Sequence, residues 1–218
     1  MRLQSPPVNS LSLDFLTEIS ISLEKLEMDK SCRGVVLTSA LPKIFCAGLD
    51  IMEMYGKSPE RYGELWKAVQ EMWLKICGSN MVTIAAINGN SPAGGCMMAL
   101  ACDYRIMAEN PHYSIGLNEV KLGIVAPFCA PEALRIGLVD QLVPEEQVLS
   151  TATETMAKWF AVPDHARQIT KSMMRKPTID KLLSNQESDI KNFVNFITKE
   201  SIQQSLRMYM ENLKKRKA

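Results

Sequence analysis

Hydrophobic residues recur every three or four positions in two segments of the chain, a spacing typical of helices with one buried face. The first segment carries them at Leu16, Ile19, Leu23 and Leu26, and the second at Leu65, Val69, Met72, Trp73 and Ile76. Ser10 or Ser12 is suited to cap the first helix, and Ser58 with Pro59 to begin the second. The first helix is predicted to be part of the scaffold.

Two short runs rich in β-branched residues, Gly34 to Ser39 and Val82 to Ile87, predict buried parallel strands. Each strand is followed by a loop, Cys46 to Ile51 in the first case, and in the second a Gly- and Pro-containing loop that gives way to a helix at Gly94. The order of strand, loop and helix indicates an α/β fold. Right-handed crossovers would bring both loops to the same edge of the sheet, where α/β folds usually bind ligands.

The remaining pattern predicts short strands and then a long helical region. The strands are expected at 104–108, 113–115 and 138–143, with a short helix after Ala130. Pro144 should begin a helix to about Phe160, Pro163 another to about Lys176, and the chain should be helical again from Thr178. Since no Gly- or Ser-rich linker interrupts the 218 residues, we expect one domain, 1–218, with an α/β core at 1–143 and a helical region at 144–218.

Composition argues against several classes of function. The net charge is +1 with both signs interspersed, and the basic run Lys214 to Lys217 is interpreted as a solvated helix end, so no nucleic-acid partner is expected. No apolar run is long enough to span a membrane. The six cysteines lack paired spacing, which predicts reduced packing thiols and no metal site. Neither histidine accompanies a nucleophile motif.

The glycine pair Gly94 and Gly95 stands where a strand and loop give way to a helix. Such a turn leaves backbone NH groups free at the helix start, where the helix dipole favours negative charge, and glycine allows a ligand to approach the backbone. The loop lacks the GxGxxG pattern, so a dinucleotide site is not predicted. A tight turn that merely packs a helix on a sheet is the alternative interpretation.

Several motifs together resemble the crotonase (enoyl-CoA hydratase/isomerase) superfamily: FCAGLDI, INGNSPAGGC, IGLNEVKLGIVAPF, GLVDQLVPEEQV and PDHARQITKSMMRK. The resemblance implies a spiral of β-β-α units followed by a C-terminal helical region through which subunits form a homotrimer. It also implies an acyl-CoA thioester substrate, no cofactor other than the CoA of the substrate, and the mitochondrial matrix as location. The first ten residues themselves have neither transit-peptide nor secretory character.

The resemblance also implies the site residues. The backbone NH groups of Leu49 and Gly94 would stabilise negative charge on the thioester oxygen, and Glu119 would act as the base that moves a proton from C2 to C4. Asn118 would border the acyl pocket. The pantetheine and thioester channel would be lined by Ala47, Gly48, Leu49, Asp50 and Ile51. Asp50 has an alternative role as a helix cap.

Met97 is expected to decide the reaction within the superfamily. Hydratases carry a second glutamate at this position, which helps to activate water, so methionine favours an isomerase that shifts the double bond of 3-enoyl-CoA to trans-2-enoyl-CoA. Another enolate-stabilising enzyme, such as a dienoyl-CoA isomerase or a hydratase, is one alternative. A non-catalytic subunit is another.

Two parts of the family pattern are missing. A block of about two helical turns or more is expected between Phe128 and Ala130, and the family begins with a strand pair ahead of Pro6 of which the sequence supplies only Met1 to Ser5. The internal block would wall the acyl pocket and contribute to subunit packing. Its absence leaves Leu49, Gly94 and Glu119 in place.

Overall fold

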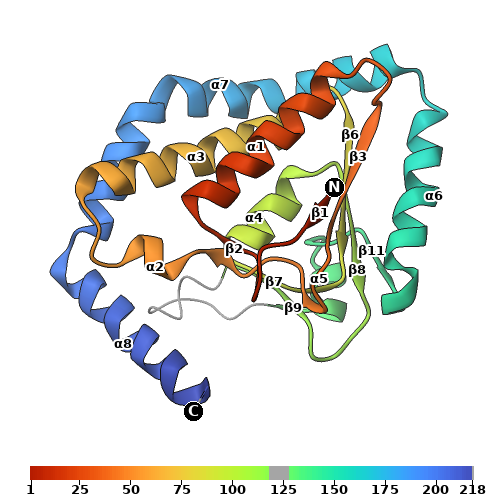
Figure 1. Ribbon diagram of the computed structural model, residues 1–218. Coiled ribbons are helices and arrows are strands. Elements are labelled where there is room, and N and C mark those ends of the chain that lie inside the picture. The colour runs from red at the N-terminus through yellow and green to blue at the C-terminus, as the bar shows by residue number, and fades with distance from the viewer. Residues whose placement is uncertain (118–127, 218) are drawn as a thin grey trace.

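A five-stranded parallel sheet forms the centre of the computed structural model, which describes residues 1–117 and 128–217 (Figure 1). Its strands lie in the order β1-β3-β6-β8-β11. Their bounds are Arg2–Leu3, Gly34–Ser39, Val82–Ile87, Tyr104–Ala108 and Gln141–Val143. The apolar residues of β6 are completely buried, as expected for a central parallel strand with both faces covered.

Two smaller sheets adjoin the central one. A four-stranded sheet has the order β10-β9-β7-β4, with bounds Phe128–Cys129, Ser114–Gly116, Gly89–Pro92 and Lys43–Ile44, and β2 (Ser10–Leu11) pairs with β5 (Gly48–Leu49). Successive units therefore give one strand to the central sheet and the next to a smaller sheet, and a helix follows. This is the predicted spiral of β-β-α units, and the predicted α/β fold class is confirmed.

Helices cover both faces of the central sheet. Figure 1 shows α1 (Leu13–Met28), α3 (Pro59–Cys77) and α4 (Gly94–Ala101) on one side and α6 (Val148–Phe160) on the other. Shorter helices are α2 (Ile51–Met54), α5 (Ala130–Arg135) and a 3₁₀ turn at Glu145–Gln147. One apolar cluster runs from Leu3 to Met156 between these layers.

The predicted starts of the two amphipathic helices are confirmed. The Ser12 hydroxyl accepts a hydrogen bond from Phe15 N at 3.2 Å, and the Ser58 hydroxyl accepts one from Arg61 N at 3.3 Å. Each hydroxyl thereby satisfies an NH group that has no partner within the helix. The strands expected at 34–39, 82–87 and 104–108 also have the predicted bounds.

Three boundaries differ from the prediction. The strand expected at 138–143 is limited to Gln141–Val143, because Gly137, with φ +76°, turns the chain out of α5 and the NH groups of Leu138 and Val139 donate to Ala133 O. The strand expected at 113–115 lies one residue later, since Tyr113 N is used in a turn with Asn110 O. The helix expected from Pro144 begins as the 3₁₀ turn and becomes α-helical at Val148.

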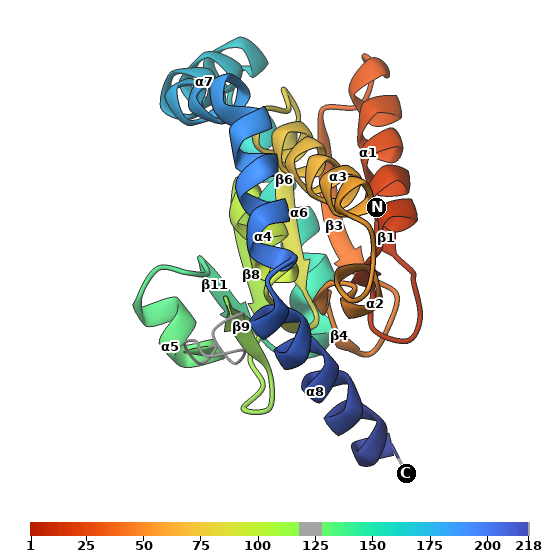
Figure 2. The same cartoon turned by 90° about the vertical axis from the view of Figure 1, so that its left-hand side faces the viewer.

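The prediction that a helix ends near Lys176 is wrong. Helix α7 continues through Pro177 from Asp164 to Ile197, and α8 follows at Glu200–Lys217 (Figure 2). An internal proline removes one hydrogen bond and crowds the preceding turn. Contacts on both sides offset this cost: Arg175 donates to carbonyl groups of α3 and α4, and Asp189 accepts hydrogen bonds from Trp66 and Gln70 of α3.

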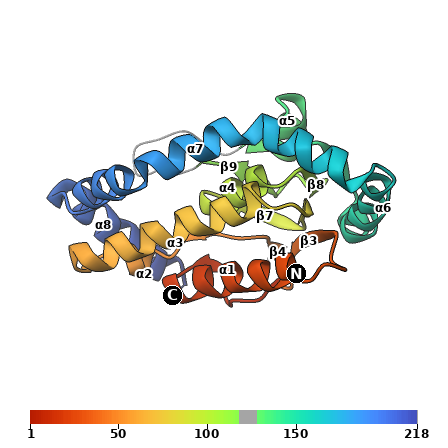
Figure 3. The same cartoon turned by 90° about the horizontal axis from the view of Figure 1, so that it is seen from above.

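The helical region packs on the rest of the chain. Helix α7 runs alongside α3, with α4 between them when seen from above (Figure 3). At its end Ile197 joins Leu206 and Tyr62 in a second apolar cluster. In the described part of the chain, no helix has both the length and the apolarity that crossing a bilayer requires.

Candidate active site

The two glycine-containing loops meet, as the sequence predicts. A Cβ atom placed on Gly48 would lie 2.9 Å from Gly94 N, and one placed on Gly94 would lie 3.2 Å from Gly48 Cα and 3.5 Å from Leu49 N. The backbone of the first loop therefore lies directly against the start of α4. Side chains at either glycine would hold the two loops apart.

Two backbone donors lie next to each other at this contact. Asp50 N donates to Leu11 O of β2 at 3.1 Å, and because successive amides of a strand point in opposite directions, the Leu49 NH points away from β2. Gly94 is the first residue of α4, so its NH belongs to the first turn, where helical partners are lacking. The helix dipole adds positive potential at the same place. The arrangement is suited to an oxygen that carries negative charge.

Ala93 connects β7 to α4 in an unusual backbone conformation, with φ 52° and ψ −124°. Such a conformation is costly for a residue with a side chain and is typical of functional turns. Hydrogen bonds on both sides hold it, from Ala93 N to Gly116 O at 2.8 Å and from Met97 N to Ala93 O at 3.0 Å. At Gly95 a Cβ would overlap the Cys46 carbonyl oxygen. Glycine is therefore required there for α4 to approach the first loop.

Asn9 supports the first loop and was not predicted from the sequence. It is fully buried with φ 53°, and its amide nitrogen donates to Ser39 Oγ at 2.8 Å and to Phe45 O at 2.9 Å. Its backbone carbonyl accepts a hydrogen bond from Cys46 Sγ at 3.2 Å. Asparagine tolerates a positive φ better than most residues, so its residue type is a local indication of this turn. Its support of the first loop could not be predicted, because Ser39, Phe45 and Cys46 lie thirty or more residues away in the chain.

The predicted channel residues lie in β5 or next to its two ends. Gly48 is buried, while Ala47, Leu49, Asp50 and Ile51 are half-buried. The Asp50 carboxylate accepts a hydrogen bond from Met52 N at 2.9 Å and caps α2. The capping role that the sequence offers as an alternative is therefore present. A role of these residues in binding a substrate remains a prediction.

Asn118 and Glu119, the other predicted site residues, lie outside the described residues. The chain before them reaches the site, because Gly116 O accepts the hydrogen bond from Ala93 N, and β9 pairs with β7 through Gly116 opposite Pro92. The last residue described on this side is Leu117, which is about half exposed. The described part of the chain thus ends two residues before the predicted base.

Met97 lies about one turn of α4 beyond Gly94 and is half-buried. It lines a mainly apolar groove of about 290 Å³ between α3, α4 and α7. Trp66, Trp73 and Leu182 form much of its wall. The position that distinguishes hydratases in the family pattern therefore faces an apolar groove.

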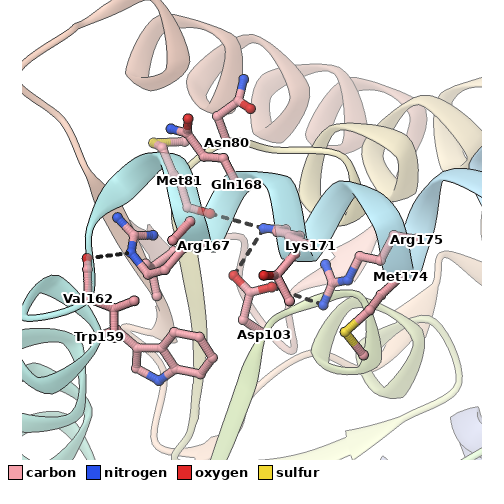
Figure 4. A pocket seen from close by; sticks show the side chains of 13 residues that line it. Asn80, Met81, Asp103, Trp159, Val162, Arg167, Gln168, Lys171, Met174 and Arg175 are labelled. Atoms are coloured by element: carbon pink, nitrogen blue, oxygen red, sulfur yellow. Dashed lines mark hydrogen bonds and ion pairs between the residues drawn. The ribbon is translucent and has the colours of Figure 1, made fainter.

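A separate cavity of about 340 Å³ lies at the other edge of the sheet, where β6 and β8 begin (Figure 4). Asp103 accepts hydrogen bonds from Thr83 N and Lys171 Nζ at 2.8 and 3.0 Å and pairs with Arg175 at 3.0 Å. Burial lowers the pKa of Lys171, and the Asp103 carboxylate opposes this shift. The cavity contains none of the predicted site residues. Sequence reasoning missed this cluster because its members are far apart in the chain.

The cysteine thiols should differ in reactivity according to burial. Burial raises the pKa of Cys46 and of Cys102 to about 12, whereas Cys129 is exposed and Cys32 is half-buried. Because the thiolate is the reactive form, a thiol reagent at pH 8 should modify Cys129 first and Cys32 next, and should leave Cys46 and Cys102 unmodified until unfolding. Peptide mapping by mass spectrometry measures this order. Early modification of Cys46 would contradict the packing of the first loop.

Within residues 1–117 and 128–217, no three His, Cys, Asp or Glu side chains gather closely enough to hold a metal ion.

The sequence profile of the enoyl-CoA hydratase/isomerase family matches residues 1–131 and 127–217. The chain belongs to this family. It is 58% identical to the mitochondrial enoyl-CoA delta isomerase 1 of Rattus norvegicus over 242 residues, covering all of this chain and 84% of the relative. The Homo sapiens protein of the same name is 55% identical, with 80% of its length covered.

A solved member of the family has nearly the same fold. The crystal structure of the human mitochondrial delta3-delta2-enoyl-CoA isomerase matches with a TM-score of 0.96 at 55% identity, covering all of this chain and 94% of that chain. The fold predicted from the resemblance is thus confirmed by a solved relative.

The comparisons also agree with a missing internal block. The alignment with the rat relative is 242 positions long, although this chain has 218 residues, so at least 24 positions (242 − 218) fall in gaps of this chain. The two parts of the family match meet at residues 127–131. This place coincides with the block expected between Phe128 and Ala130.

Proposed function

We propose that the chain is an enoyl-CoA isomerase that converts cis- or trans-3-enoyl-CoA to trans-2-enoyl-CoA in the oxidation of unsaturated fatty acids. The observation that carries the proposal is the pair of backbone donors, Leu49 NH and Gly94 NH, at the contact of two loops in a chain 55–58% identical to enoyl-CoA delta isomerases. Members of the enoyl-CoA hydratase/isomerase family act on CoA thioesters, which gives the donors a suitable ligand.

The thioester oxygen would lie between the two donors. Removing a proton from C2 shifts negative charge onto this oxygen, and donors that are already oriented stabilise the charge without reorganisation. Removing one such donor from an enzyme typically lowers the rate by about 10²–10³. The close packing of Gly48, Gly94 and Gly95, together with the constrained Ala93, supports a preorganised arrangement.

Glu119 would carry the proton. Its carboxylate takes a proton from C2 of the 3-enoyl-CoA, the C2 electron pair forms the C2–C3 double bond, and the former C3–C4 double bond accepts the same proton at C4. The reaction is balanced within one substrate, so no oxidant, reductant or water is consumed. The position of Gly116 beside Ala93 supports this assignment, because Glu119 follows only three residues later.

We propose that the acyl chain passes Met97 into the apolar groove beside Trp66 and Trp73. Apolar walls exclude water from the enolate, which suits isomerisation rather than hydration. We also propose that the protein works as a homotrimer in the mitochondrial matrix and requires no cofactor beyond the CoA of its substrate. The exposed apolar residues Ile169, Met173 and Met174 on α7 support assembly, and the names of the relatives support the compartment.

The direct test is turnover of cis- and trans-3-enoyl-CoA by the purified chain, followed by the absorbance of the conjugated thioester. We expect conversion without added metal or nucleotide. The alignment gap supports a second candidate, a subunit that keeps the fold but lacks activity. A chain that forms trimers and binds acyl-CoA but shows no turnover would favour this second candidate.

Met97→Glu is expected to introduce weak hydratase activity toward 2-enoyl-CoA. The new carboxylate would lie about one turn from Gly94, where it can orient a water molecule, but the surrounding groove is apolar and supplies few groups to hold it. The product, 3-hydroxyacyl-CoA, is measured by chromatography. If the variant folds and binds substrate but forms no such product, Met97 does not face the reacting carbons.

A further inference from the structure

The short helix α4 carries Gly94 at its amino end and is held at its carboxyl end by Arg175 of α7. The guanidinium donates to Ala101 O at 3.0 Å, to Cys102 O at 3.1 Å and to Cys77 O, the last residue of α3, at 3.0 Å. These acceptors belong to the ends of two helices, where carbonyl groups lack helical partners. One side chain thus ties α3, α4 and α7 together.

Asp103 fixes the same end of α4 to the sheet. Its carboxylate pairs with Arg175 at 3.0 Å and accepts a hydrogen bond from Thr83 N of β6 at 2.8 Å, while Asp103 N donates to Thr83 O at 2.8 Å. Figure 4 shows Asp103 and Arg175 pointing toward one another at the wall of the cavity. Only 10% of the Asp103 side chain is exposed, so solvent screens the pair little.

We propose that Arg175 is a positioning residue for the oxyanion hole, acting along α4 on the orientation of the Gly94 NH. A helix of eight residues is about 12 Å long and too short to be stable by itself, so its direction depends on what holds its ends. The amino end is held by the Ala93 turn, and the carboxyl end by Arg175 and Asp103. This inference rests on the proposed function.

Loss of Arg175 removes the donor from Cys77 O and Ala101 O, while Cys102 O keeps a hydrogen bond from Arg105. It also removes a cation from the carboxyl end of α4, where a cation is favourable to the helix dipole. A small tilt of α4 changes the distance between the Gly94 NH and the thioester oxygen, and misplacement by about 1 Å can cost about 10²-fold in rate. Substrate binding depends mostly on other contacts. The effect should therefore fall on kcat more than on KM.

The test compares Arg175→Met with Arg167→Met. Arg167 lies two turns earlier on α7 and lines the same cavity, but its hydrogen bonds go to Asp164 and Val162 O and its guanidinium lies over the Phe160 ring. We expect Arg175→Met to lower kcat about tenfold to a hundredfold with KM changed less than about threefold, and Arg167→Met to change kcat less than about twofold. Arg175→Lys should recover part of the loss, because one ammonium cannot reach all three carbonyl groups.

A second readout follows the hydrogen bonds to the thioester without any reaction. A conjugated acyl-CoA chromophore bound to the protein absorbs at longer wavelength when its carbonyl accepts strong hydrogen bonds. We expect this red shift to be reduced in Arg175→Met and kept in Arg167→Met, with both variants saturated by the ligand. Methylguanidinium, which can enter the cavity beside residue 175, should partly restore kcat in Arg175→Ala.

The outcomes separate the two proposals. If the unchanged chain binds the chromophore without a red shift and does not isomerise 3-enoyl-CoA, the proposed function fails whatever Arg175 does. If the unchanged chain is active and Arg175→Met keeps both its kcat and its red shift, the positioning role is overturned. Equal loss of kcat in Arg175→Met and Arg167→Met would also overturn it, because the effect would then come from the attachment of α7 in general.

Discussion

Glu119→Gln is expected to lower the isomerase rate by at least about a hundredfold while acyl-CoA binding changes little. General-base catalysis typically contributes about 10²–10⁴ in rate, and no other acid is predicted at the reacting carbons. The substitution keeps the size of the side chain, and the thioester is held by backbone NH groups of other segments. Steady-state kinetics with 3-enoyl-CoA and calorimetric binding of a saturated acyl-CoA measure the two effects separately.

Glu109→Gln is a matched control for this variant. Glu109 is an exposed acid between β8 and β9, in the same part of the chain as Glu119 but on a surface turn. Its replacement should leave turnover unchanged. A Glu119→Gln variant that retains more than about a hundredth of the original rate would show that another group is the base.

The parts of the fold that were predicted correctly have local causes. The strands at 34–39 and 82–87 and the caps at Ser12 and Ser58 follow from burial patterns and hydrogen bonds within a few residues. The two-residue strands β1, β2, β4, β5 and β10 could not be predicted in this way. They exist because distant backbone segments pair with them, as Ser10 does opposite Gly48.

Helix α7 at Pro177 also depends on distant contacts and not on local sequence. Local propensity predicts a break before this residue, but α7 continues because its two halves are attached separately to α3. Before the proline, Arg175 donates to Cys77 O, and after it, Asp189 accepts from Trp66 Nε1 at 2.7 Å. A helix held at both ends tolerates one missing hydrogen bond. Such contacts are not visible in the pattern of a single segment.

Part of the candidate site could likewise be predicted from the sequence, and part could not. The glycines of both loops are visible in the sequence, and their close approach is found in the structure, because only residues without a side chain fit where Gly48 meets Gly94 and Gly95 meets Cys46. The roles of the supports, Asn9 and Arg175, are not visible in the sequence, although Arg175 lies within the motif PDHARQITKSMMRK. Each satisfies backbone carbonyl groups that become neighbours through the fold, so their role appears only when those partners are known.

The second large effect is expected from restoring the missing block, which should change both stability and turnover. Restoring a family-like helical segment between Phe128 and Ala130 is expected to raise the melting temperature and the isomerase rate. In this chain β10 passes directly into α5, and Leu117, Leu134 and Ile136, which flank this junction, are 41–49% exposed. Exposed apolar side chains that lie together often mark a surface that another element covers, and an added helix could cover these residues.

The expected size of this effect follows from buried area. Covering a few hundred Å² of apolar surface at about 25 cal/mol per Å² stabilises by several kcal/mol, which is comparable with the stability of a whole domain. The comparison requires thermal unfolding, sizing and the isomerase assay on both forms of the chain, with a Gly- and Ser-rich insert of equal length as control. The flexible insert should not raise the melting temperature, since it supplies length without an apolar face. Equal melting temperature and equal turnover of the helical form and the present chain would mean that the described residues already close the pocket.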